Sequence, residues 1–204
     1  MHYMSDVDCW NICNPKHLWI FDKLIVAKRL GYNAGPAGVP ITKPGKYIIR
    51  PIMNLHMMGR GAFISDENVT IPDGFFWCEK FTGRHISIDY YRGKKALTVE
   101  GFRDDNTRLD RFSMWKKIDD FSFDVPTIFK PILNSYDWVN FELIDGKVIE
   151  VHLRFNDDFE NHTSDVIYPV WKDSVRELNE ETEDFYPNEC ADRLGFIVKK
   201  GTLN

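Results

Sequence analysis

The sequence has few cysteines and no pair of them at metal-binding spacing. Its four cysteines (residues 9, 13, 78 and 190) form no Cys-x-x-Cys pair, and the histidines do not follow zinc-finger spacing. A structural zinc site is therefore not expected. Cys9 and Cys13 would be neighbours on a helix, and we interpret them as structural free thiols, as is typical of a cytosolic protein.

Long hydrophobic runs and an excess of positive charge are also missing. The longest apolar run, LWIF at 18–21, is too short to span a bilayer, and the first residues, MHYMSDVDCW, do not resemble a signal peptide. We therefore expect a cytoplasmic protein without a membrane partner. The net charge of −5 argues against a protein that coats nucleic acid, although it does not exclude a local basic cleft.

The elements that are present predict an α+β protein with mainly antiparallel strands and a few flanking helices. The 204 residues suffice for one large domain or two small lobes, and no internal repeat or low-complexity segment interrupts them. Helices are predicted at 16–31, 125–136 and 163–180, and strands at 46–52, 75–81, 85–91, 92–102, 139–155 (a hairpin) and 193–200.

The stretch KVIEVHLRFN, residues 147–156, carries Glu150, His152 and Arg154 at alternate positions. A β-strand would place these three side chains on one face. Glu150 together with Glu142 or Asn140 could supply oxygen ligands to Mg²⁺, and Arg154 could hold a phosphate. The residues alone leave a solvated strand face as an open alternative.

The register of this hairpin decides which residue lies opposite Glu150. A bulge at Gly146 would place Asn140 there, whereas a plain two-residue turn at Asp145 and Gly146 would place Phe141 there.

Two further segments combine basic residues with glycine. Lys23 projects onto the apolar side of the predicted helix 16–31, which favours a side chain that snorkels to water over an ammonium aimed at an anion in a cleft. Arg50 interrupts a short strand, and Gly59 and Gly61 follow in a loop that also holds Arg60. Backbone N–H groups of such a loop can bind phosphate oxygens, although a plain turn has the same sequence pattern.

The segment WCEKFTGRHISIDYY contains a short connection between two predicted strands. Glu79, Lys80 and Phe81 end the first strand, and His85 begins the second. This arrangement is typical of a connector that binds adenine through its backbone and ribose through a polar side chain. A half-exposed hairpin with a surface histidine is the alternative.

Taken together and in this order, these stretches resemble the ATP-grasp superfamily over about residues 20–156. DKLIVAKRLG resembles the family's Asp-Lys and the small helix that follows it, IIRPI its strand with a second ATP-contacting lysine, and MMGRGA its glycine-rich loop. CEKFTGRHISID is similar to the hinge of biotin-carboxylase-like members, and IEVHLR resembles the Glu-x-Asn-x-Arg strand that binds magnesium and phosphate.

The resemblance implies two small α+β lobes that clasp a nucleotide, at residues 20–80 and 81–204, after an N-terminal extension at 1–19. ATP and Mg²⁺ are the implied cofactors, with Mn²⁺ as a second choice of metal. The implied site residues are Lys23, Arg50, Gly59, Arg60 and Gly61 for the phosphates, Glu79, Lys80, Phe81 and His85 for adenosine, and Glu150, Glu142, Asn140 and His152 for the metal. Arg154 and Arg50 would act catalytically on the transferring phosphoryl group.

The sequence departs from the family pattern at three points. Arg50 replaces a lysine, which keeps the charge and changes the geometry. His152 stands where the family has asparagine, and imidazole suits Mn²⁺ or Zn²⁺ better than Mg²⁺. The segment before residue 20 is too short for the usual N-terminal domain, so we expect a minimal ATP-grasp unit of the compact kind that a phage carries, in the host cytoplasm.

The implied activity is that of an ATP-dependent carboxylate–amine ligase of the peptide type, acting through an acyl phosphate. Its expected partners are small-molecule or peptide carboxylate and amine substrates, with a homodimer as a further expectation and without nucleic acid. Arg103, Arg108 and Arg111 could receive the carboxylate, unless they belong to a solvated loop. Two other functions stay open: a nucleotidyltransferase of the RNA/DNA-ligase type with Lys80 as nucleophile, and a catalytically silent nucleotide-binding or structural protein.

Overall fold

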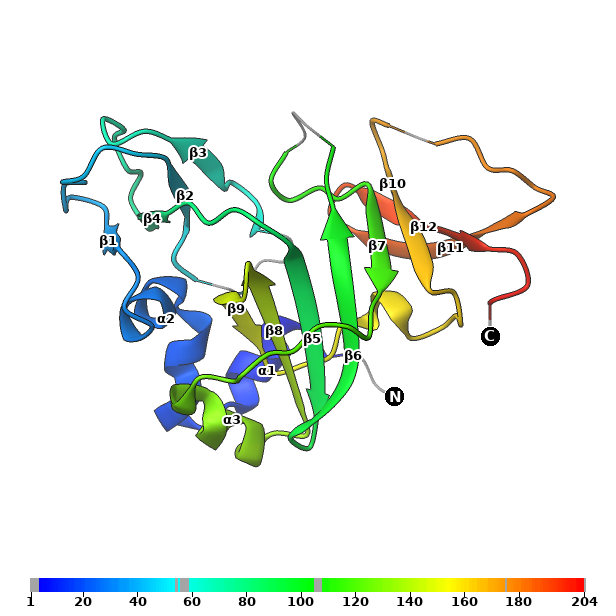
Figure 1. Ribbon diagram of the computed structural model, residues 1–204, viewed down its shortest axis with the longest axis horizontal. Helices are drawn as coiled ribbons and strands as arrows, with labels where there is room; N and C mark the ends of the chain where they lie inside the picture. Colours follow the sequence, from blue (N-terminus) through cyan, green and yellow to red (C-terminus); the bar gives the residue numbers. More distant parts are fainter. Residues whose placement is uncertain (1–3, 54, 56–58, 105–107, 175, 204) are drawn as a thin grey trace.

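The structure is a computed structural model, and it describes residues 4–53, 55, 59–104, 108–174 and 176–203. Two antiparallel sheets and a few short helices make up the fold (Figure 1), which confirms the predicted α+β class. The smaller sheet has the strand order β1-β4-β2-β3, and the larger sheet has the order β11-β12-β10-β7-β6-β5-β8-β9.

Chain order divides the strands cleanly between the two sheets. The smaller sheet contains β1 (Ala34–Pro36), β2 (Tyr47–Pro51), β3 (Phe63–Ser65) and β4 (Phe75–Glu79). The larger sheet contains β5 (His85–Tyr91), β6 (Lys94–Phe102), β7 (Met114–Lys117), β8 (Trp138–Ile144), β9 (Lys147–His152), β10 (Val166–Trp171), β11 (Glu183–Cys190) and β12 (Arg193–Lys199).

The short link between β4 and β5 crosses from one sheet to the other. β4 pairs with β1 and β2, whereas β5 pairs with β6 and β8. The two strands are therefore not a hairpin, and the hairpin interpretation of this segment is wrong. Gly83 in the link has a φ of 131°, and a Cβ there would lie 2.8 Å from the Cβ of Asp145. Glycine is thus required where the link passes the β8–β9 turn.

The helices are short, and two of the three predicted ones form in altered shape. They are α1 (Asp6–Ile12), α2 (Lys23–Arg29), α3 (Lys130–Ser135) and the 3-10 turns η1 (Pro15–Phe21), η3 (Thr127–Phe129) and η4 (Asp157–Phe159). The predicted helix 16–31 is divided at Asp22, whose side chain accepts a hydrogen bond from the N–H of Ile25 and caps α2. Gly31, with a φ of 77°, follows the end of α2 and is the last residue of the range 16–31 predicted as helical. Pro131 lies in the first turn of α3, where its missing N–H costs nothing.

The predicted helix at 163–180 is wrong, because this segment supplies β10. Val166, Ile167 and Val170 are β-branched, and such side chains favour a strand. Pro169 lies in the middle of the segment and would interrupt a helix. β10 pairs with β7 on one side and β12 on the other.

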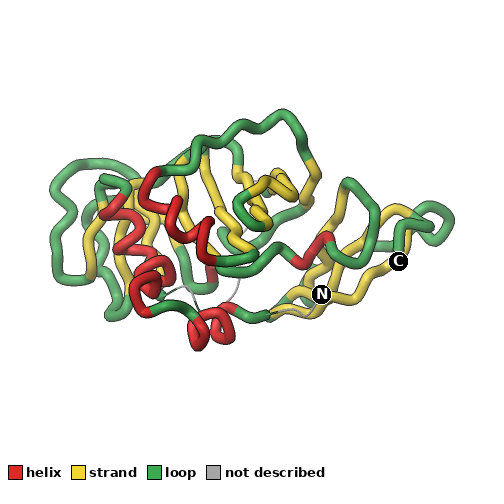
Figure 2. The backbone as a smooth tube through the Cα atoms, turned by 90° about the horizontal axis from the view of Figure 1, so that it is seen from below, coloured by secondary structure: helices red, strands yellow, loops and turns green. Residues whose placement is uncertain are grey.

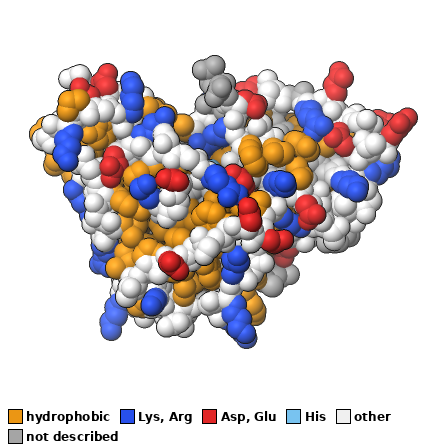
Figure 3. All heavy atoms as spheres, viewed as in Figure 1, with side chains coloured by type: hydrophobic (Ala, Val, Ile, Leu, Met, Phe, Trp, Pro, Cys, Tyr) orange, Lys and Arg blue, Asp and Glu red, His pale blue; other side chains and the backbone are white. Residues whose placement is uncertain are grey.

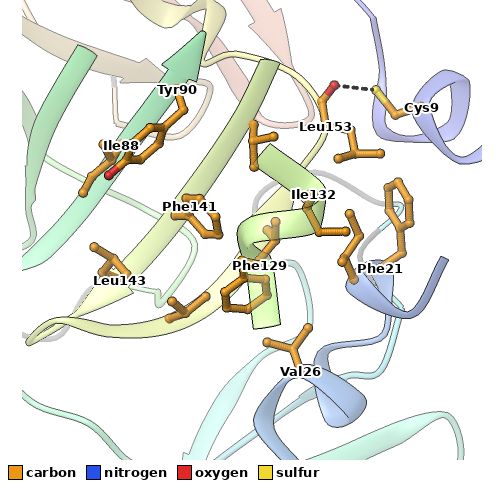
Figure 4. Close-up of a cluster of buried hydrophobic side chains, with 14 of the residues drawn as sticks. Cys9, Phe21, Val26, Ile88, Tyr90, Phe129, Ile132, Phe141, Leu143 and Leu153 are labelled. Atoms are coloured by element: carbon orange, nitrogen blue, oxygen red, sulfur yellow. Dashed lines mark hydrogen bonds between the residues drawn. The ribbon is translucent and has the colours of Figure 1, made fainter. Parts of the chain in front are cut away.

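The main hydrophobic core lies between one face of β5, β8 and β9 and the helices (Figure 4). Ile88 of β5 and Phe141 and Leu143 of β8 pack there against Phe129 and Ile132. Figures 1 and 2 show α1, α2 and α3 gathered at the end of the molecule away from the C-terminus. The four cysteines are buried free thiols, in agreement with a structural role for Cys9, whose Sγ lies 3.4 Å from the carbonyl oxygen of Leu153. None of the helices in the described part of the chain is long and apolar enough to cross a membrane.

Candidate active site

A β-bulge sets the register of the β8–β9 hairpin. Both residues of the turn at 145–146 have positive φ, 51° and 74°, as in a two-residue hairpin turn. The pairing then shifts by one residue inside the strands, so that Glu142 lies opposite Glu150 and Asn140 lies opposite His152. Both predicted partners of Glu150 are wrong, because the extra residue lies in the strand and not in the turn.

Directly paired residues of antiparallel strands project to the same face of the sheet. The face of β5, β8 and β9 that points away from the core therefore carries polar side chains from all three strands. These are His85, Ser87 and Asp89 of β5, Asn140 and Glu142 of β8, and Glu150 and His152 of β9. All of them except the half-buried Glu142 are buried, so this is not a solvated strand face.

This polar face forms one wall of a cleft between the two sheets. Ile48 and Arg50 of β2 line the cleft from the smaller sheet, and Ile144, Ile149 and Glu150 line it from the larger sheet. In Figure 3 the outline of the molecule is notched at the top, between the parts that hold the two sheets. Apolar side chains on opposite walls of the cleft lie next to charged side chains around Glu150, which we call the floor. This arrangement suits a ligand with a flat ring and a charged tail.

Two buried cations meet at Glu150. The side chain of Lys23 is 2% exposed, and its Nζ donates to Glu150 Oε1 over 3.4 Å. Arg50 Nη1 donates to the same oxygen over 3.4 Å, and Arg50 Nη2 donates to the carbonyl of Ile149 over 3.0 Å. The snorkelling interpretation of Lys23 is wrong, because the break before α2 makes Lys23 the first residue of that helix and turns its ammonium toward β9.

The electrostatic balance around Glu150 favours an anionic ligand. Burial lowers the pKa of Lys23, and the neighbouring Glu150 carboxylate opposes that effect. Lys23 and Arg50 together carry one positive charge more than Glu150 neutralises. Arg50 Nε is buried and has no hydrogen-bond partner in the described part of the structure. A buried unpaired donor on a cation in a cleft fits a site for phosphate oxygens.

The glycine-rich loop lies next to this pair of cations. Gly59 and Arg60 line a small cavity together with Lys23, and Gly59 also lines the main cleft. Gly59 and Gly61 have φ values of 59° and 81°, which glycine adopts without strain. The loop is therefore placed where its backbone could contact the same anion as Lys23. Its residues 57 and 58 lie outside the described part of the chain.

The carboxylates on the floor fit a divalent cation bound with a nucleotide. Glu142 and Glu150 are opposite each other, and the described residues hold no cluster of three or more His, Cys, Asp and Glu side chains suited to a metal. A metal at the two carboxylates would complete its shell with phosphate oxygens and water, as Mg²⁺ commonly does. Burial raises the pKa of Glu142, but the hydrogen bond and charge of His85, 3.2 Å away, lower it further, so this carboxylate is ionised.

Asn140 belongs to a neighbouring polar network. Its Nδ2 donates to Ser87 Oγ and Asp89 Oδ1, both over 2.7 Å, and the N–H of Asn156 also donates to Asp89. Of the two residues that the sequence left open as the second metal ligand, the structure favours Glu142 over Asn140, because Glu142 is the residue that pairs with Glu150.

The sequence interpretation missed a buried carboxylate of this site. Asp6, in the first turn of α1, is 1% exposed. Its Oδ1 accepts from His152 Nδ1 over 2.9 Å and from Arg154 Nε over 3.1 Å, and its Oδ2 accepts from Arg154 Nη2 over 3.1 Å. The capping pattern of Ser5 and Asp8 predicts a helix start here, but nothing in the local sequence connects it with a strand 146 positions away.

The contact between Asp6 and His152 changes the pKa values of both groups. Burial raises the pKa of Asp6, but His152 and Arg154 lower it far below its ordinary range. Burial lowers the pKa of His152, whereas Asp6 raises it, and the net effect is a raised pKa. His152 Nε2 lies 3.7 Å from Glu150 Oε2. The imidazole of His152 therefore lies between the carboxylates of Asp6 and Glu150, and the Asp6 carboxylate also binds Arg154.

The adenosine-binding predictions divide into two groups. His85 lines the cleft, where Arg103 Nη2 lies 3.4 Å from its Nδ1. Glu79, Lys80 and Phe81 do not line it, and they stay predictions. Glu79 accepts the N–H of Asn33, the N–H of Lys80 donates to the carbonyl of Lys46, and Phe81 packs against Tyr32 with ring centroids 4.8 Å apart.

The three arginines proposed for the substrate carboxylate lie in different surroundings. Arg103 lines the cleft and stacks over the ring of Phe112 at 4.1 Å. Arg108 and Arg111 form ion pairs with acidic residues, namely Asp110, Asp173 and Asp192. Arg103 is thus the member of this group that faces the cleft, and residues 105–107 lie outside the described part of the chain.

Comparison with known proteins finds this two-sheet arrangement among solved structures. Neither the protein-family models nor the curated protein sequences contain a match. Solved structures do match. An N5-carboxyaminoimidazole synthetase from Staphylococcus aureus, in complex with ADP, aligns with a TM-score of 0.54 at 12% identity and covers 92% of this chain and 69% of its own. An L-amino acid ligase from Bacillus licheniformis aligns with a TM-score of 0.54 at 11% identity, covering 89% of this chain and 66% of its own.

A third structure names the fold. A protein from Archaeoglobus fulgidus, provisionally assigned to the ATP-grasp superfamily, aligns with a TM-score of 0.52 at 14% identity, covering 88% of this chain. This chain spans 64% of the length of that protein. The chain therefore has the ATP-grasp fold, as its sequence motifs suggested, and identities this low carry no more than the fold.

Proposed function

We propose that the protein is an ATP-dependent ligase that activates a carboxylate as an acyl phosphate and joins it to an amine. The observation that carries this proposal is the convergence of Lys23 and Arg50 on Glu150, opposite Glu142, in a cleft between the two sheets. The likeness to a fold that also occurs in an N5-carboxyaminoimidazole synthetase and an L-amino acid ligase supports it.

Each residue of the site has a distinct part in this proposal. Lys23 and Arg50 would bind the phosphates of ATP and offset the negative charge that moves during transfer. Ile48 and Ile149 would hold the adenine ring, with His85 at the ribose and the backbone of the β4–β5 link at the base edge. Glu142 and Glu150 would hold Mg²⁺ or Mn²⁺, which supplies charge neutralisation between phosphate oxygens.

Two further arginines would contact the substrate carboxylate or the transferring phosphoryl group. Arg154 lies on the floor beyond Glu150, where it can face the transferring phosphoryl group, and Arg103 is the arginine of the 100–116 segment that faces the cleft. The proposal also includes two lobes, at residues 20–80 and 81–204, that would clasp the nucleotide. Within it, the N-terminal segment contributes to the floor through Asp6.

The decisive experiment separates binding from turnover. ATP or ADP with Mg²⁺ or Mn²⁺ should raise the melting temperature of the wild-type protein, and should do so less in Lys23→Met. ADP release should then be screened with pools of carboxylates and amines, with amide formation followed by mass spectrometry. Nucleotide binding without ADP release for any acceptor would favour a silent nucleotide-binding protein, and the absence of binding would overturn the proposal.

A further inference from the structure

The cleft extends across the larger sheet, beyond the floor around Glu150. Strands β8, β5, β6 and β7 lie between β9, which carries Glu150, and β10 (Figure 1). At the far end of the cleft, Asp157 of η4, Trp171 of β10 and Arg193 of β12 line it, together with Phe112 from the link between β6 and β7. A nucleotide bound at the floor would therefore leave this far end to a second molecule.

The charged side chains of the far end differ in whether they have a partner. Arg193 Nη1 donates to one oxygen of Asp158 over 3.2 Å, and Arg193 Nη2 lies 3.0 Å from the other. Arg154 is bound by Asp6. The half-buried Asp157, in contrast, forms no ion pair with any residue that the structure describes. Burial and the charge of Asp158 raise its pKa, and Arg154 and Arg193 offset that shift only in part.

A carboxylate in this position fits a ligand that brings its own cation. A half-buried charge is costly without a partner, and an ammonium group can donate charge-assisted hydrogen bonds to it. The neighbouring cations cannot supply this contact, because Asp158 and Asp6 already bind them.

The walls of the far end are aromatic and fixed by their neighbours. Trp171 Nε1 donates to the carbonyl of Phe112 over 3.3 Å, which connects β10 with the link before β7. The guanidinium of Arg111 lies over the ring of Trp171 at 5.0 Å, and the ring centroids of Phe112 and Trp115 are 4.2 Å apart. Rigid rings beside a single charged group suit a ligand with an apolar or aromatic body and one charged end.

We propose that the far end of the cleft binds the amine substrate, with its ammonium group at Asp157 and an aromatic or apolar body against Phe112 and Trp171. The role of this amine as acceptor rests on the proposed ligase function. Asp157 follows Arg154 by three residues, so at most about 11 Å separates their Cα atoms. The amine is therefore held beside the arginine that would face the transferring phosphoryl group.

The reaction of this amine balances without a further reactant. The ammonium first loses one proton to solvent. The neutral nitrogen then attacks the acyl carbon, so that the C–N bond forms while the C–O bond to the phosphoryl group breaks. The second nitrogen proton leaves with inorganic phosphate. Asp157 selects and places the amine, and it does so by binding the charged form.

Three small probes separate the contributions of charge and ring. They are 2-phenylethylamine, 2-phenylethanol, which has the same ring and no charge, and methylamine, which has the charge and no ring. Their binding to the nucleotide-free protein is measured by ligand-observed NMR titration. We expect 2-phenylethylamine to bind most tightly of the three. In Asp157→Asn its affinity should fall about 10- to 100-fold, the range for a lost charge-assisted hydrogen bond, while that of 2-phenylethanol stays unchanged.

Two further variants control for charge and for folding. Asp157→Glu keeps the carboxylate and should retain the preference for the amine over the alcohol. Asp165→Asn removes the same charge from a side chain that is 82% exposed, outside the cleft, and should bind all three probes as the wild type does. A lower melting temperature of Asp157→Asn with an unchanged ratio of amine to alcohol affinity would show that Asp157 is only structural, and the inference would be wrong.

The remaining outcomes distinguish this inference from the proposed function. Absence of 2-phenylethylamine binding, or equal affinity for 2-phenylethanol, overturns the inference even if ADP with Mg²⁺ binds to the same sample. If ADP with Mg²⁺ does not bind while amine binding depends on Asp157, the ligase function fails and the amine site stands.

Discussion

The buried charged residues around Glu150 (the phosphate end) and the predicted hinge at residues 79–81 (the hinge end) are built from different kinds of contact. At the phosphate end, Lys23, Arg50, Glu150, His152 and Asp6 are all buried, and each one contacts another charged group of the set. At the hinge end, Glu79, Lys80 and Phe81 are half-buried or exposed and contact neighbouring backbone or a single ring.

This difference has a physical reason. Removing charges from water is expensive, and a buried ion pair seldom repays that cost through its own attraction. A cluster of five buried charged groups therefore contributes little to stability, but it suits a site that binds a charged ligand. A base edge, in contrast, can be recognised by backbone N–H and C=O groups, so the side chains of the hinge are less constrained.

The largest effect is expected from Glu150→Gln. This change leaves Lys23 and Arg50 without their shared carboxylate, and breaking a buried ion pair typically costs about 3–5 kcal/mol. Urea unfolding should show this loss of stability, and isothermal titration should show that ADP binding no longer depends on a divalent cation. Glu100→Gln, which removes a carboxylate paired with the exposed Arg84, is the control and should cost much less. Equal losses in the two variants would contradict the special position of Glu150.

A pH-dependent change in stability is expected from Asp89, the residue of β5 that pairs with Asn140. Burial raises the pKa of Asp89 from 3.8 to about 6, and the hydrogen bonds from Asn140 and Asn156 oppose this shift only in part. The folded state therefore holds a proton that the unfolded state has lost between about pH 4 and 6. Stability contributed by this group is present below pH 4 and is lost as the pH rises to about 6.

Asp89→Asn isolates this effect, because an amide does not titrate. The difference in the free energy of unfolding, wild type minus variant, should fall by about 2–3 kcal/mol from pH 4 to pH 6.5 and stay level above that. Urea titrations at half-unit pH steps would measure it. A difference that rises with pH would show that Asp89 is stabilised as a carboxylate in the folded protein.

Lys23→Met should affect nucleotide binding more than stability. Methionine keeps much of the stem volume in the core and removes the ammonium, while Glu150 keeps its contact with Arg50. Loss of a charge-assisted hydrogen bond of about 1.5–3 kcal/mol corresponds to an affinity for ATP that is roughly 10- to 100-fold weaker. Lys28→Met, on the exposed side of the same helix, is the matched control for isothermal titration and should bind as the wild type does. Equal affinities in the two variants would remove Lys23 from the site.

The sequence predicted the site best where its information is local. Glu150 and His152 lie on β9, and alternation alone places their side chains on one face. The prediction that Arg154 lies on the same strand is wrong, because β9 ends at His152. The glycine loop with Gly59 and Gly61 was likewise predicted from residue type and spacing. The order of these segments was sufficient to suggest the ATP-grasp fold, which the structural comparison then confirmed.

The parts that the sequence did not predict depend on contacts between distant residues. The inward turn of Lys23 follows from a helix break at Asp22, and the pairing of Glu142 with Glu150 follows from a bulge inside a strand. Asp6 reaches His152 across 146 positions of sequence, and no pattern within either segment encodes that contact. In each case tertiary packing decided between alternatives that local propensity left equal.

The smallest effect is expected at the hinge, from Lys80→Ala. The side chain of Lys80 is exposed, and its backbone N–H is engaged by the carbonyl of Lys46, a contact that alanine also makes. ATP affinity and the melting temperature should therefore stay close to those of the wild type. The same variant also tests whether the protein is a nucleotidyltransferase, in which Lys80 would form a covalent bond to AMP. Incubation with α-labelled ATP should leave the wild-type protein unlabelled. A labelled wild type that loses its label in Lys80→Ala would reverse the comparison, because the hinge and not the phosphate floor would then hold the reactive group.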